Sequence, residues 1–157
     1  MKNQRISLIC ACITLFSLYA TAQPPVPNDP DYNKPLAFAN FPDQIPVSLN
    51  TLDNLINSKT GTSINTVFST TDATNIFEGT VVSTVSKYDD KLQMVLIKST
   101  NYNGATLSIS KVITPEGVTK YHGRMMKDLI YGDIYVLQSS DAGFVLVKKN
   151  YYNVIRE

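Results

Sequence analysis

Apolar and polar residues alternate along most of the second half of the chain. From Ser63 onward, segments rich in Val, Ile, Thr and Tyr are separated by turn-forming residues, and Asn-Gly is a strong hairpin signal. The pattern predicts strands at about 76–88, 91–100, 105–113, 118–126, 133–139 and 143–149, with a weaker strand at 64–69. The turns between them lie at Asp89-Asp90, Asn103-Gly104, Pro115-Glu116-Gly117, Gly132-Asp133 and Asp141-Ala142-Gly143.

The segment 105–113 shows the alternation best, because apolar and hydroxyl side chains fall on opposite faces of a strand. An antiparallel sheet exposes an edge unless it curls shut or is capped. We therefore predict a mainly β fold, a single antiparallel β-meander of about six to seven strands that forms a small barrel or a curved sheet. The two sets of side chains are Leu107, Ile109, Ile113 and Thr106, Ser108, Ser110.

One short helix is predicted at about residues 50–58, in the segment SLNTLDNLINSKTG. Its apolar residues have helical spacing, Ser48 or Asn50 can cap its start, and Gly61 can end it. The C-terminal segment NYYNVIRE is compatible with a further helical turn. The apolar positions are Leu49, Leu52, Leu55 and Ile56.

Seven of the eight prolines lie between Pro24 and Pro46, which excludes a helix or a central strand there. Residues 23–47 are therefore predicted to be an extended Pro-rich arm. We expect Gln23 to Asn33 to be mobile. The segment from Leu36 to Ile45 is apolar enough to lie along the sheet, where proline is tolerated at an edge.

The first 22 residues have the features of a secretory signal peptide. MKNQR is basic, a short apolar run follows, and Ala20-Thr21-Ala22 offers a small-residue cleavage site. This predicts three parts: a signal peptide at 1–22, the arm at 23–47 and a β-rich domain at 48–157. The mature protein would be periplasmic or extracellular, with no transmembrane segment. Lipoprotein anchoring through Cys12 is disfavoured, because cleavage there would leave the apolar ITLFSLYA at the new N-terminus.

Composition excludes several chemistries. Cys10 and Cys12 are the only cysteines and lie in the signal peptide, so the mature chain would lack disulfides and thiolates. Residues 23–78 carry two lysines against six acids, and residues 79–157 carry ten basic residues against seven acids. Neither part has the concentrated basic stripe of a nucleic-acid-binding protein. One histidine without cysteine disfavours a zinc site, and phosphate-binding glycine motifs are absent, so we predict neither metal nor cofactor.

The segment KYHGRMM contains His122, the only histidine of the chain. On a strand, His122 and Arg124 share a face near Lys120, whereas Tyr121 points the other way. These three residues could bind an anion, or His122 could act as a general base. We favour the simpler interpretation that they belong to an ordinary solvated face of the sheet. Tyrosine, abundant in the second half, suits recognition surfaces. The candidate ligand-binding residues are His122, Arg124, Lys120, Tyr121 and Tyr135; no catalytic residue is predicted.

Three functions are compatible with these features. The leading hypothesis is an exported, non-catalytic β-domain that binds a protein or another envelope ligand. An alternative is an inhibitor or pro-domain-like partner of a secreted enzyme, acting through the arm or a hairpin. A small hydrolase with a site around His122 is disfavoured, because GxSxG and a complete catalytic triad are missing from the sequence pattern. The sequence defines neither the ligand nor the oligomeric state.

Overall fold

The computed structural model describes residues 33–69, 72–141 and 143–154, all within one compact unit. The predicted signal peptide lies outside the described residues. So does the segment 23–32, which is nearly all of the stretch from Gln23 to Asn33 that was predicted to be mobile. Within the described ranges, eight strands and two short helices follow one another along the chain. They are β1 (Gln44–Val47), α2 (Leu49–Ile56), β2 (Ser63–Ser69), β3 (Asp72–Lys87), β4 (Leu92–Ser99), β5 (Thr106–Ile113), β6 (Thr119–Met126), β7 (Asp133–Ser140), β8 (Gly143–Asn150) and α3 (Tyr151–Val154).

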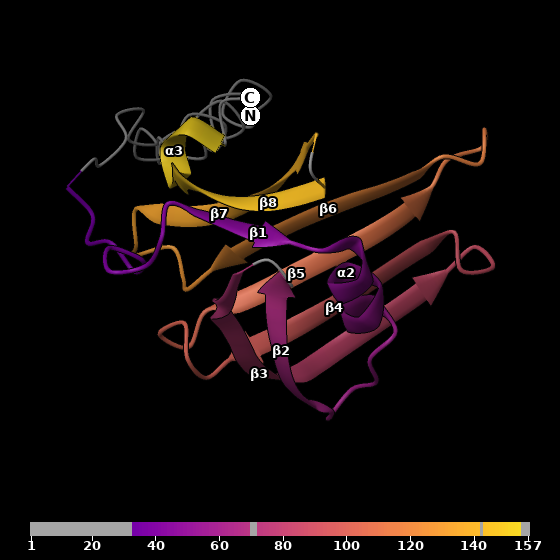
Figure 1. Cartoon of the computed structure of the whole chain (residues 1–157), viewed down its shortest axis with the longest axis horizontal. Coiled ribbons are helices and arrows are strands. Elements are labelled where there is room, and N and C mark those ends of the chain that lie inside the picture. Colours follow the sequence, from indigo (N-terminus) through magenta and orange to yellow (C-terminus); the bar gives the residue numbers. More distant parts are fainter. Residues whose placement is uncertain (1–32, 70–71, 142, 155–157) are drawn as a thin grey trace, which may run out of the picture. The chain divides into compact units, whose positions relative to one another are not determined.

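The strands form one antiparallel sheet that curls into a nearly closed barrel (Figure 1). Its order is β1-β8-β7-β6-β5-β4-β3-β2, so the first two strands of the chain are its edges. The edges approach each other where the Ser48 N–H donates to the Phe68 carbonyl at 2.8 Å. The mainly β, barrel-like meander is thus confirmed, whereas the predicted count of six to seven strands is too low.

The missed strand is β1, at the end of the Pro-rich arm. Prolines at positions 42 and 46 disfavour a strand in sequence terms. Pro46 nevertheless lies opposite Val145 in the pairing with β8. This placement is tolerated because β1 is an edge strand, where the missing proline N–H breaks no inner ladder.

Helix α2 begins at Leu49 and ends at Ile56, slightly earlier than predicted. The Ser48 hydroxyl accepts a hydrogen bond from the Thr51 N–H, as an N-cap should. The helix ends at its C-cap Asn57, before Gly61. Of its four apolar residues, Leu49 is 49% exposed and the other three are buried. A second short helix, α3, follows β8 in the C-terminal segment NYYNVIRE, where the sequence was compatible with a helical turn.

The arm from Lys34 onward is held against the barrel. The buried Asp133 carboxylate accepts hydrogen bonds from the N–H groups of Ala37 and Phe38, at 2.6 and 2.8 Å. Phe38 and Ile45 are fully buried, as expected for a segment along the sheet, whereas Leu36 is 55% exposed. The arm therefore contributes to the core.

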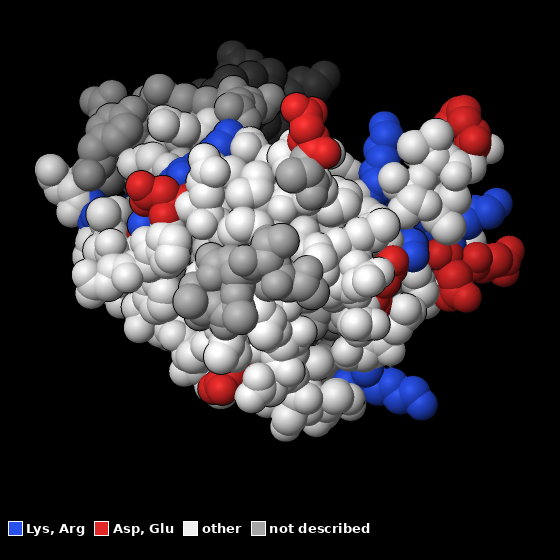
Figure 2. Space-filling view, viewed as in Figure 1, with Lys and Arg blue, Asp and Glu red and all other residues white. Residues whose placement is uncertain are grey.

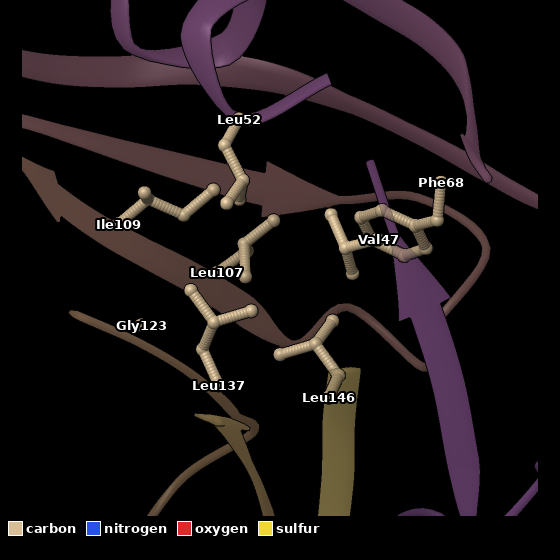
Figure 3. A pocket seen from close by; sticks show the side chains of 8 residues that line it. All are labelled: Val47, Leu52, Phe68, Leu107, Ile109, Gly123, Leu137 and Leu146. Carbon is tan, nitrogen blue, oxygen red and sulfur yellow. The ribbon is translucent and has the colours of Figure 1, made fainter. Parts of the chain in front are cut away.

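Side chains from the arm, from α2 and from every strand fill the interior. Leu52, Leu107 and Leu146, for example, converge on one another across the barrel (Figure 3). The space between the apolar side chains that line this region is too small for a water molecule. Among the described residues, this part of the barrel therefore has a packed core where a ligand-binding barrel would have a lumen. This lining consists of Val47, Leu52, Phe68, Leu107, Ile109, Gly123, Leu137 and Leu146.

Candidate functional site

Strand β6 carries the KYHGRMM segment and separates its residues by face. His122 and Arg124 are exposed on the outer face of the barrel, and so is Lys120. Tyr121 and Met125 point inward, and Met125 is completely buried. The prediction that His122 and Arg124 share a face is confirmed by this burial pattern.

Gly123 makes this arrangement of β6 possible. A Cβ atom at this position would lie 3.2 Å from the Leu137 Cβ and 3.3 Å from the Ser108 carbonyl oxygen. Contacts of that length are tighter than side chains normally tolerate, so the absence of a side chain lets β7 pack closely. His122 and Arg124, its two neighbours, lie on the outside because side chains alternate along the strand.

The five candidate ligand-binding residues do not form one group. His122, Arg124 and Lys120 are outside, whereas Tyr121 and Tyr135 lie on the inner side of the sheet. Tyr135 is fully buried, its hydroxyl donates to the Pro42 carbonyl, and burial raises the pKa of its phenol. The structure therefore separates an outer group of three basic residues from an inner pair of tyrosines.

Tyr121 belongs to a polar cluster that joins α2 to the barrel. Its hydroxyl donates to Asp53 Oδ1 at 2.6 Å, and the Lys111 ammonium donates to the same oxygen at 2.8 Å. The bonds from Lys111 and then Tyr121 hold the pKa of the Asp53 carboxyl below its usual value. The bond to Asp53 likewise raises the pKa of Lys111. Since both donors are bonded to Asp53 of α2, the cluster is best explained as the attachment of this helix to the barrel.

On the outer face, two serines of β5 lie directly opposite the two basic residues of β6. Ser110 pairs with His122, and Ser108 pairs with Arg124. Within the described part of the chain, the side chains of His122 and Arg124 make neither a hydrogen bond nor an ion pair. Their donor groups are therefore available to a ligand.

These four residues lie in a surface depression that we call the outer groove. It consists of two adjoining hollows of about 320 and 530 Å³, which share Ser108 and Arg124. Its two sets of lining residues are Met94, Ser108, Ser110, His122, Gly123, Arg124, Val136 and Val154, and then Leu96, Thr106, Ser108, Arg124, Met126, Lys127, Leu129 and Tyr151.

The outer groove is basic and amphipathic. Arg124, Lys127 and His122 line it together with methionine, leucine and valine side chains, and none of the described lining residues is acidic. Asp128 follows Lys127 in the chain, but its carboxylate accepts a hydrogen bond from the Ile130 N–H and is not part of the lining. Charge complementarity therefore favours an anionic group in this groove.

Elsewhere the surface differs in character. Figure 2 shows few charged atoms over α2, β1 and β2, and a concentration of both signs at the end where the β3–β4 and β5–β6 hairpins extend (Figures 1 and 2). Since acids and bases are mixed there, that end lacks the single sign of the outer groove.

Sequence reasoning missed Ser108, Ser110 and Lys127 as candidates. The two serines could have been found, since a hairpin folded symmetrically about Glu116 places residue 110 opposite 122 and residue 108 opposite 124. Lys127 could not be found from strand pairing, because its position depends on how the β6–β7 loop folds. In the structure its ammonium lies 4.9 Å from the centre of the Tyr131 ring, which belongs to the same loop.

Comparisons with known proteins give no relative from which a function could be transferred: no family model, no curated protein and no solved structure matches the chain. Among the described residues, no three His, Cys, Asp or Glu side chains come together as metal ligands would. Neither described helix has the length and apolar character needed to cross a bilayer.

Proposed function

We propose that this chain is an exported, non-catalytic binding domain whose ligand docks in the outer groove. The observation that carries the proposal is the contrast between the two sides of the sheet. The inside is filled by apolar side chains, whereas the outside offers hollows of about 320 and 530 Å³. Ligand sites commonly have this size and combine apolar walls with a few polar groups.

A steric block of the groove tests this proposal. Ser108 lies on the groove floor and points outward, so Ser108→Trp fills the groove without entering the core. Thr80→Trp is the matched control, because Thr80 is exposed on the outer face of β3 and does not line the groove. Both variants should melt close to the wild type.

The assay is retention of envelope components by immobilised mature protein, residues 23–157. We expect a component retained by the wild type and by Thr80→Trp to be lost with Ser108→Trp. If both variants retain the same components as the wild type, the ligand does not dock in the outer groove.

A second candidate, a small hydrolase, is supported by one observation, the position of Ser110 opposite His122. Nucleophilic catalysis also needs a group that orients the base. None of the described residues that line this part of the groove is acidic, and His122 has no carboxylate partner among them. We therefore prefer binding. Labelling by a fluorophosphonate probe that Ser110→Ala abolishes would reverse this preference.

The alternative function, an inhibitor of a secreted enzyme, would use a different part of the surface. An inhibitor acting through the arm needs a free arm, whereas Ala37 and Phe38 are buried against Asp133. The β3–β4 turn offers a better candidate, because Tyr88 is 73% exposed at its tip. A hollow of about 250 Å³ lies between this hairpin and the end of α2, but Tyr88 does not line it. We place this candidate behind the outer groove, since the exposed turn is a single loop outside that hollow.

A further inference from the structure

Building on the proposed function, we infer that the ligand of the outer groove is an extended, acidic segment of a partner protein, with one of its carboxylates bound by Arg124 and His122. The inference rests on the hydrogen-bonding groups of the groove, its direction and its apolar walls.

The centre of the groove is rich in hydrogen-bond donors. The cross-strand pairs Ser108–Arg124 and Ser110–His122 place a guanidinium, an imidazole and two hydroxyls on four adjacent positions. Arginine presents a planar fork of N–H groups that matches a carboxylate. Because both basic side chains lack a partner within the described chain, a carboxylate would bind without displacing an internal ion pair.

The groove runs parallel to β5 and β6. His122, Arg124 and Met126 follow one another along the outer face of β6, and side chains two residues apart on a strand are about 7 Å apart. The lining continues into the β6–β7 loop at Lys127 and Leu129. The groove therefore has the length of about four residues of extended chain.

Apolar side chains flank the donors. Met94 and Leu96 of β4 lie on one side, and Val136 of β7 with Val154 of α3 lies on the other. Met126 and Leu129 continue the apolar surface toward one end. A ligand that fits both features carries apolar residues next to its acidic residue.

The floor of the groove favours a polypeptide over a fatty acid. Thr106, Ser108 and Ser110 place three hydroxyls along it, which the amide groups of an extended segment can hydrogen-bond. An acyl chain would leave these hydroxyls without partners and, in an open groove, would keep part of its own surface in water.

The test measures binding of a fluorescent octapeptide of alternating Glu and Leu by anisotropy, with an octapeptide of alternating Lys and Leu as the charge control. We expect only the Glu peptide to bind, and its affinity to fall as salt is raised. Arg124→Ala should weaken binding by roughly 10-fold to 100-fold, because a charge-assisted hydrogen bond is lost. Lys59→Ala removes an equal charge at an exposed site outside the groove and should change the affinity by less than about twofold.

Two competitors separate the alternatives. Laurate or inorganic phosphate should displace the Glu peptide only weakly. If laurate or phosphate binds in an Arg124-dependent way while the Glu peptide does not bind, the inferred ligand is wrong and the groove remains the site. If the Glu peptide binds equally to Arg124→Ala, Ser108→Trp and the wild type, both the inferred ligand contact and the proposed site are wrong.

Discussion

At the scale of single residues, Asp133 shows how one charge can hold two distant segments together. It lies at the start of β7, is 4% exposed and accepts hydrogen bonds from two consecutive N–H groups of the arm, about a hundred residues earlier in the chain. Charge-assisted bonds of this kind are about twice as strong as neutral ones. The sequence alone does not reveal this role, because Asp133 lies at a predicted turn like several other acidic residues.

We predict that Asp133→Ala destabilises the fold by about 3 kcal/mol, since two buried N–H groups lose their acceptor. The melting temperature should fall by about 10 °C. Asp141→Ala, at an exposed turn, is the control and should have a negligible effect. Equal melting temperatures for the two variants would show that Asp133 does not anchor the arm.

At the scale of elements, the attachment of α2 should depend on pH through Asp53. The folded state holds the pKa of this carboxyl below its usual value, chiefly through the bond from Lys111. A carboxyl whose pKa is lowered on folding adds stability above its unfolded pKa of about 4 and loses that contribution as the pH falls through the folded value.

The corresponding prediction compares the wild type with Asp53→Asn in urea unfolding. At pH 7 the variant should be less stable by about 1 kcal/mol, a modest value because Asp53 and Lys111 are partly exposed. The difference should shrink as the pH is lowered from about 4 toward 2. A difference that stays constant over that range would exclude the ionised carboxylate as its source.

The arm is the second element whose contribution can be measured. Deleting residues 23–33 should leave the melting temperature nearly unchanged. Deleting residues 23–46 should lower it and promote aggregation, because the core loses Phe38 and Ile45, and β8 loses its β1 partner. Thermal melts and light scattering of the two truncated chains provide the measurement. Identical behaviour of both would mean that the docked arm contributes nothing to stability.

Most elements could be predicted from sequence because their signals are local. The β4–β5 hairpin follows from Asn103-Gly104, whose backbone φ angles of 51° and 68° are the left-handed values that such a turn requires. Strand β1 could not be predicted this way, since its pairing with β8 spans about a hundred residues and contradicts the local effect of Pro46. The end of α2 was also misplaced, because Asn57 caps it before Gly61 is reached.

At the scale of the whole molecule, the packed core and the outer groove lie on opposite sides of the same strands. Alternation along β6 was enough to predict that His122 and Arg124 share a face. The alternation could not predict that Tyr135 is buried. Nor could it predict that α3 and the β6–β7 loop form walls of the groove, because those positions depend on how the barrel closes. Only part of the candidate site was therefore visible in the sequence.

The central claim is that the ligand binds outside the barrel, and the methionines test it directly. Met94 and Met126 line the outer groove, whereas Met125, the neighbour of Met126, is fully buried inside. In mature protein labelled with ¹³C at the methionine methyls, the Glu-Leu octapeptide should shift the signals of Met94 and Met126 and leave that of Met125 in place. A shift of Met125 alone, or no shift of any of the three at saturating peptide, would contradict the claim.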